Sequence, residues 1–166
     1  MVSANNNEAI DDELHVAEKF INYLNQIYKK DFVLPFHPKE DISIDALTHR
    51  KSNPNEILKM QIVSSDFKAM ESLGKEETYT TFRDVTEKIR DCIVIPILHK
   101  TNRYSTDFKK DIILLLNGWR TVTEEDLNHF KTRILNSYFI LKKTGFKEIW
   151  FVSEKYDGPI YRLWPY

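Results

Sequence analysis

Two short runs of apolar residues, separated by a polar turn, stand out in the first half of the chain. The first run ends near Thr48, the turn covers residues 52–55, and the second run begins at Ile57. Pro and Asn in the turn interrupt the apolar pattern, as they do in loops between paired strands. The pattern therefore predicts a β-hairpin.

Polar residues of this hairpin are expected to share one site. A period of two places Lys59 and Gln61 on the same face of the second strand. On the first strand Asp45 alternates with Ile44 and Ala46, so its side chain is expected on the face opposite to theirs. An acid on one strand and a Lys/Gln pair on its neighbour would form a small polar site. The alternative is a solvated outer face of the hairpin.

The N-terminal part of the chain is predicted to form an amphipathic helix. After a polar tail of residues 1–8, apolar residues recur at helical spacing from about Glu8 to Lys29, namely Ile10, Leu14, Ala17, Ile21, Leu24 and Tyr28. Glu13 lies at one edge of this apolar stripe, where it could border a buried site. The alternative interpretation is an acid favoured by the positive end of the helix dipole.

The segments around the hairpin follow less regular patterns. Phe32–Phe36 is apolar but contains Pro35, which suits an edge strand. A short helix is predicted at Asp66–Leu73. Thr81–Asp84 has the spacing of a capping box and predicts the start of a longer helix, which Pro96 should kink or end.

Strands and helices are predicted to alternate in the second half of the chain. The apolar run Asp111–Asn117 is typical of a strand covered on both faces, and it is the candidate for the centre of the sheet. A second capping box at Thr123–Asp126 opens a helix that runs to Lys143. Glu148–Ser153 and Ile160–Trp164 are predicted to be further strands.

Composition narrows the classes of protein that fit this pattern. The chain has 166 residues, of which 42% are hydrophobic and 13% aromatic, which predicts one domain with a sizeable core. Lys and Arg (24) nearly balance Asp and Glu (25), so no global field indicates a nucleic-acid or membrane partner. Any basic surface must therefore be local.

The cysteine content and the N-terminal residues indicate the cellular compartment. The single Cys92 excludes an internal disulfide, and the five His are scattered without the spacing of zinc ligands. The first residues lack the pattern of a leader, and no apolar run is long enough to cross a bilayer. We therefore expect a soluble cytoplasmic protein that does not interact with membranes.

The predicted order of helices and strands is similar to that of a known protein superfamily. The order resembles the core of the restriction-endonuclease-like, or PD-(D/E)xK, nuclease superfamily, over most of the chain from about Asp12 to Trp150. It is supported by the Asp45–Gln61 hairpin, the basic helix end at residues 97–104 and the apolar run at residues 111–116. The resemblance implies an α/β fold with a restriction-endonuclease-like αβββαβ core, in which helices flank a central mixed sheet.

The resemblance also implies a chemistry, the Mg²⁺-dependent hydrolysis of phosphodiester bonds in DNA. Asp45 matches the first metal-binding acid of the superfamily, and Gln61 stands where the second is expected. Val63 stands where a Lys is expected, so Lys59 on the same face is the candidate to replace it. Glu13 resembles an acid found on the first helix of some members. An active protein of this kind would be a metal-dependent endodeoxyribonuclease.

Alternatives to this assignment remain open. Asp66 and Lys68 form a literal acid-x-Lys pair just beyond the apolar part of the second strand, and they define a second possible register. A catalytically inactive member of the same fold, binding nucleic acid or a protein partner, is the runner-up function. The third class is an unrelated α/β protein whose polar hairpin face is merely solvated.

Basic residues gather on and after the helix that precedes the central strand. They are Lys88, Arg90, His99, Lys100, Arg103, Lys109 and Lys110, interleaved with Tyr104 and Phe108. Such a cluster could follow a phosphate backbone, with Lys100, Arg103 and Lys109 as candidate nucleic-acid contacts. The alternative is a solvated helix end whose cations complement the dipole. The sequence leaves the oligomeric state open.

Overall fold

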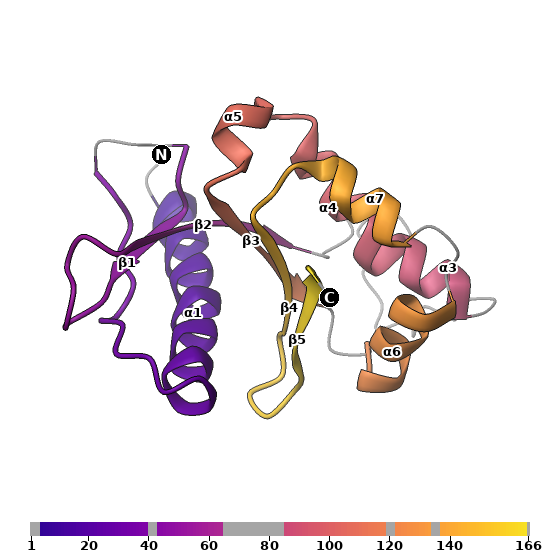
Figure 1. Ribbon diagram of the computed structural model, residues 1–166, viewed down its shortest axis with the longest axis horizontal. Coiled ribbons are helices and arrows are strands. Elements are labelled where there is room, and N and C mark those ends of the chain that lie inside the picture. The colour runs from indigo at the N-terminus through magenta and orange to yellow at the C-terminus, as the bar shows by residue number, and fades with distance from the viewer. Residues whose placement is uncertain (1–3, 40–42, 65–84, 119–121, 134–136, 166) are drawn as a thin grey trace.

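The computed structural model describes residues 4–39, 43–64, 85–118, 122–133 and 137–165. Within these ranges the chain forms a five-stranded mixed sheet with helices on both faces (Figure 1). The short helix predicted at Asp66–Leu73 and the capping box predicted at Thr81–Asp84 fall outside the described residues.

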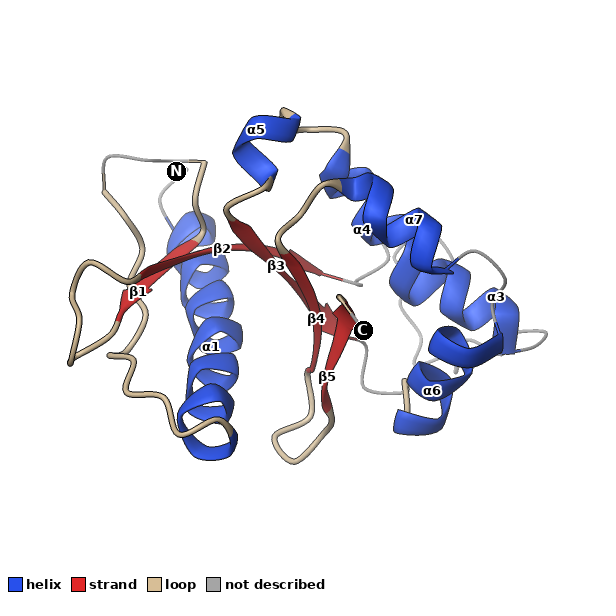
Figure 2. Ribbon diagram, viewed as in Figure 1, coloured by secondary structure: helices blue, strands red, loops and turns tan. Residues whose placement is uncertain are grey.

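The strands follow one another across the sheet in sequence order. They are β1 (Ala46–His49), β2 (Ile57–Ser64), β3 (Ile112–Gly118), β4 (Glu148–Ser153) and β5 (Ile160–Trp164). The pairs β1–β2 and β4–β5 are antiparallel, whereas β2–β3 and β3–β4 are parallel. Figure 2 shows these strands running through the middle of the molecule. The prediction that the apolar run starting at Asp111 forms the centre of the sheet is confirmed, because β3 lies between β2 and β4.

The predicted hairpin is confirmed, whereas the predicted edge strand is reduced to two bridges. Phe32 and Phe36 each form a single antiparallel bridge, to Arg50 and Leu47 respectively. Pro35 lies between them and has no N–H to donate, which interrupts a continuous ladder. The outer edge of β1 is therefore only partly covered.

One long helix covers one face of the sheet, and shorter helices cover the other (Figure 1). The long helix is α1 (Ala4–Ile27), and the opposite face carries α3 (Val85–Ile89), α4 (Ile95–Thr101), α6 (Glu124–Arg133) and α7 (Ser137–Thr144). A short helix, α5 (Thr106–Lys109), precedes β3. None of the helices in the described ranges is both long and apolar enough to span a membrane.

Each face of the sheet has its own hydrophobic core, and β3 contributes to both. Ile113 and Leu115 pack on the α1 face, whereas Ile112, Leu114 and Leu116 pack on the opposite face. All five side chains are at most 3% exposed. The prediction of a strand covered on both faces is confirmed, and removal of this apolar surface from water is the main force that holds the helices to the sheet.

Pro96 is accommodated within a helical segment rather than ending it. The residues between α3 and α4 form a π-helical turn, Arg90–Val94, and α4 then continues to Thr101. Pro96 lies in the first turn of α4, where a missing N–H costs little. The wide turn just before it is the local distortion that lets the chain stay helical.

The capping box predicted at the start of α6 is confirmed. The Asp126 N–H donates to Thr123 Oγ1 (3.2 Å), and the Thr123 N–H donates to Asp126 Oδ2 (2.8 Å). The same Asp126 oxygen accepts a bond from Lys88 Nζ (2.6 Å), which ties α6 to α3. The single helix predicted from Thr123 to Lys143 is described as two elements, α6 and α7, on either side of residues 134–136.

Candidate functional site

Asp45 lies at the point where β1 stops pairing with β2. Its N–H donates to the carbonyl oxygen of Met60 (3.1 Å), and its Oδ2 accepts the N–H of Ile62 (2.6 Å). Regular pairing of β1 begins only at Ala46, so the carboxylate replaces the next backbone bond on β2. The acid is thus fixed to the strand that it borders.

The backbone around Asp45 departs from the alternation that the sequence predicts. Ile44 packs in the core beneath α3 to α7, whereas Ala46 packs in the core beneath α1. The expectation that Ile44 and Ala46 share a face opposite to Asp45 is therefore wrong. The physical reason is a bend at Asp45, before the strand begins.

Lys100, near the end of α4, makes hydrogen bonds both to β2 and to Asp45. Its Nζ donates to the carbonyl oxygen of Ile62 (2.8 Å) and to Asp45 Oδ2 (3.2 Å). The side chains of Lys100 and Asp45 are only 11% and 14% exposed, so solvent screens this ion pair weakly. An ammonium group has three N–H donors, and these two contacts leave one for a further acceptor.

Gln61 is fully buried beside this ion pair. Its Nε2 donates to the carbonyl oxygen of Ser43, and its Oε1 accepts the hydroxyl of Tyr104 (3.0 Å). The Tyr104 ring stacks on Phe108, with 4.9 Å between ring centroids. Burial raises the pKa of Tyr104, and the charge of Asp45 raises it further, so the hydroxyl remains a donor.

Glu13 of α1 faces the same residues. Burial raises the pKa of its carboxyl, and the negative charge of Asp45 adds to this effect, while Lys100 and His37 oppose it. His37 lies close as well, with 3.0 Å between its Nδ1 and the carbonyl oxygen of Asp45. Two partly buried carboxyl groups that repel each other favour either a proton or a cation between them.

These six residues, which we call the Asp45 cluster, are Glu13, His37, Asp45, Gln61, Lys100 and Tyr104. Lys59 was expected among them, but the structure places it as an exposed residue of β2. The amine that contacts Asp45 belongs to Lys100 instead. Asp66 and Lys68, the pair that defines the alternative register, fall outside the described residues.

Of the three residues predicted to contact nucleic acid, Arg103 has an exposed side chain. Lys100 is held by Asp45. Lys109 is 6% exposed, and its Nζ donates to the carbonyl oxygen of Thr101 (3.1 Å) at the end of α4. An ammonium group buried in this way stabilises a helix end and is not presented to a phosphate at the surface.

Sequence reasoning missed His37 and Tyr104 and gave Lys100 a different role. The spacing of Lys100 and Tyr104 at a helix end is visible in the sequence. Nothing in that spacing shows that α4 crosses the sheet beside Asp45, because this contact joins residues 55 positions apart. Only the packing of α4 on the sheet reveals it.

The Asp45 cluster contains the ligand types that a hard cation requires. Glu13 and Asp45 supply carboxylate oxygens, and the Gln61 oxygen keeps one lone pair after accepting the Tyr104 hydroxyl. In the described ranges, no three His, Cys, Asp or Glu side chains gather closely enough to hold a metal. Mg²⁺ is commonly bound by one or two carboxylates together with phosphate oxygens, and the donor set fits that mode.

The fold and the site together establish only the architectural class of this protein. It is an α/β protein with a five-stranded mixed sheet and a partly buried cluster of acid, amine and amide groups where β1 begins. No family model, curated protein or solved structure matches the chain. Its function must therefore be inferred from the geometry.

Proposed function

We propose that this protein is a divergent member of the PD-(D/E)xK nuclease superfamily that hydrolyses phosphodiester bonds in DNA with Mg²⁺. The observation that carries the proposal is the partly buried ion pair of Asp45 with Lys100, with Glu13 of α1 near enough for both charges to shift its pKa. The order of elements supports it in part: a helix, the β1–β2 hairpin, the α3–α4 segment and β3 follow one another, but the αβββαβ core has one more strand before its second helix, where the described residues show only the isolated bridges of Phe32 and Phe36.

Five of the six members of the Asp45 cluster have a role in this proposal. Glu13 and Asp45 would hold Mg²⁺, with Gln61 as a third ligand. The bound ion would activate water and offset charge on the phosphate. The remaining N–H of Lys100 would donate to a phosphate oxygen and stabilise the negative charge that develops there. Tyr104 fixes the orientation of the Gln61 amide through its hydroxyl.

A second candidate is a non-catalytic module of the same fold that binds nucleic acid or a protein partner. One observation favours it: the side chains of Asp45 and Gln61 already have hydrogen-bond partners within the chain. Asp45 Oδ2 accepts bonds from Ile62 and Lys100, and both ends of the Gln61 amide are engaged. A network satisfied in this way can serve structure alone.

Cleavage of plasmid and single-stranded DNA with Mg²⁺ or Mn²⁺, against an EDTA control, tests the proposed function. We expect cleavage by the wild type and its loss in Asp45→Asn and Lys100→Met, with folding checked by circular dichroism. Lys59→Gln should retain cleavage, because the exposed Lys59 side chain is not the amine that contacts Asp45.

Other outcomes would support a different set of site residues or the non-catalytic candidate. Loss of cleavage in Lys59→Gln would support the assignment of the amine from the sequence pattern, and loss in Asp66→Ala would support the alternative register. A wild-type protein that cuts neither DNA nor RNA with either ion, yet binds DNA with a clear loss of affinity at high salt, would establish the non-catalytic candidate.

A further inference from the structure

A groove separate from the Asp45 cluster lies near the C-terminal end of α1. It has a volume of about 270 Å³, and its apolar floor includes Leu58, Ile113 and Trp150 from three neighbouring strands. Leu24 of α1 also lines it, eleven residues after Glu13, which corresponds to about 16 Å along the helix. The groove is therefore a distinct feature on the α1 face of the sheet.

Aromatic side chains shape one side of this groove. Tyr28 is 47% exposed, and its ring centroid lies 6.5 Å from that of Trp150 in an edge-on arrangement. Trp150 itself is only 2% exposed and lies beneath the guanidinium of Arg162, which is 5.7 Å from its ring centroid. Tyr28 is thus the aromatic ring that a flat ligand can reach, and Trp150 supports it from below.

Positive charge prevails along the rim. Lys30, Lys147 and Arg162 line the groove, and none of them forms a salt bridge within the described ranges. Two acids also line the groove, so its cations outnumber its acids by three to two. Glu56 pairs with Arg50 (3.1 Å), and Glu148 accepts the indole N–H of Trp150 (2.7 Å).

We propose that this groove binds one nucleotide of a single-stranded nucleic acid. An exposed aromatic ring provides a stacking surface for a base, and cations that form no salt bridge with another described residue suit the adjoining phosphate. The volume is below the range of about 300–1,000 Å³ typical of drug-sized ligands, so it suits a single base rather than a larger group. This binding goes beyond the proposed hydrolysis and does not require it.

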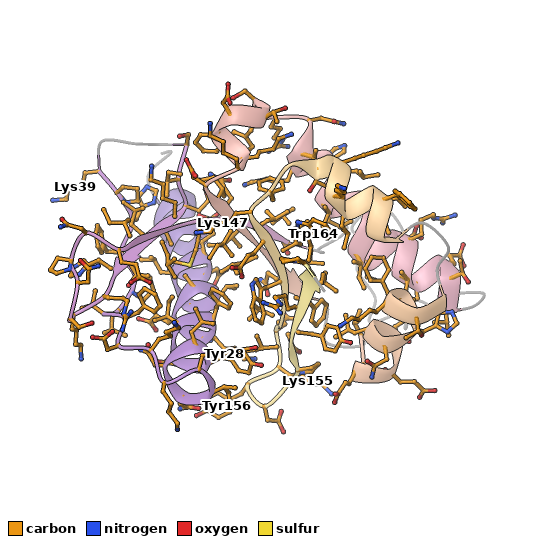
Figure 3. The ribbon with its side chains drawn as sticks, viewed as in Figure 1. Tyr28, Lys39, Lys147, Lys155, Tyr156 and Trp164 are labelled. Carbon is orange, nitrogen blue, oxygen red and sulfur yellow. The ribbon has the colours of Figure 1, made fainter. Side chains whose placement is uncertain are left out.

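Fluorescence anisotropy with a labelled oligothymidylate in EDTA tests this site without any cleavage. Tyr28→Ala should weaken binding at least about fivefold through lost stacking. Lys147→Gln should also weaken binding and reduce the salt slope by about 0.7. Figure 3 labels both residues, together with Lys39 and Tyr156, which lie outside the groove lining.

Lys39 and Tyr156 provide matched controls. Lys39→Gln removes the same charge as Lys147→Gln, and Tyr156→Ala removes a ring that is 94% exposed. Both controls should bind as the wild type does. Equal weakening by a control and its groove counterpart would mean nonspecific attraction and would overturn the proposal, as would unchanged binding in Lys147→Gln.

Competition identifies what the groove recognises. Thymidine monophosphate should displace the oligonucleotide, whereas inorganic phosphate at the same concentration should not. Equal displacement by both would show a simple anion site and overturn the proposal. Asp45→Asn should leave this binding intact, so a failure of the proposed hydrolysis and a failure of the groove are measured separately.

Discussion

At the scale of single residues, the ionisation of Glu13 is the property that most directly reflects the proposed site. Burial and the charge of Asp45 raise its pKa above the ordinary value of 4.5. The folded state therefore holds the proton more tightly than the unfolded state, and ionised Glu13 lowers stability as pH rises through its titration. Glu13→Gln should raise Tm at neutral pH, and the gain should vanish once the pH is well below 4.5.

Thermal unfolding across this pH range checks the expectation. Glu18→Gln, which removes an acid from the same helix outside the Asp45 cluster, should not show the same dependence. A Glu13→Gln protein that is less stable than the wild type at neutral pH would contradict it, because Glu13 would then be a stabilising anion.

Lys100 supports a second prediction at this scale. Lys100→Met would leave the Asp45 carboxylate and the carbonyl of Ile62 without the donor that they share. Loss of a partner from a buried polar group costs about 1–3 kcal/mol. Urea unfolding should show that loss for Lys100→Met and almost none for Lys59→Met, whose side chain is exposed. Equal effects of the two substitutions would show that the Lys100 contacts contribute no stability.

At the scale of elements, the end of β3 depends on the close approach of Gly118 to the ring of Phe151. A Cβ atom added at Gly118 would lie 2.1 Å from ring atoms of Phe151, a side chain that is fully buried and cannot withdraw. Gly118→Ala should therefore destabilise the protein by about 1–3 kcal/mol through overpacking. Adding Phe151→Leu, which removes the clashing ring atoms, should cost less than the two single changes summed, and simple additivity would refute the clash.

Helices and strands with a regular apolar pattern could be predicted from the sequence, whereas the irregular backbone at their ends could not. The apolar stripe of α1, the alternation in β2 and the reciprocal cap of Thr123 and Asp126 are local patterns, so the sequence carries them directly. The bend at Asp45 and the π-helical turn before Pro96 depend on packing against distant segments. At Asp45 the predicted alternation differs from the structure, and at Pro96 the helix, which was predicted to kink or end, continues after the π-helical turn.

At the scale of the whole molecule, some cations of the chain are held by other residues and are not available to a polyanion. Formal net charge is −1, and Lys88 and Lys100 are held in partly buried ion pairs. If the three groove cations, Lys30, Lys147 and Arg162, together neutralise the two phosphates that flank the bound nucleotide, the slope of log K against log salt should be about −1.4 for single strands. Affinity measured over a salt series checks this value, and a slope several times steeper would indicate a larger basic surface.

The relation between sheet order and sequence explains why the architecture could be predicted while the site could not. Neighbouring strands are consecutive in the chain, so a linear list of elements nearly specifies the sheet. The Asp45 cluster instead joins α1, the residues just before β1, β2 and the end of α4. Which amine reaches Asp45 depends on the crossing of α4 over the sheet, and Lys59 and Lys100 cannot be distinguished before that crossing is known.

Binding of Mn²⁺, followed by its electron paramagnetic resonance signal, tests most directly whether the acids of the Asp45 cluster hold a divalent cation. Free Mn²⁺ should fall on addition of wild-type protein, and this binding should be lost in both Asp45→Asn and Glu13→Gln. Protons compete for the Glu13 carboxyl, whose pKa is raised, so binding should also weaken as the pH falls toward the range in which Glu13 is protonated. Mn²⁺ binding that is absent in the wild type, or equal in the wild type and both variants, would contradict the proposed site.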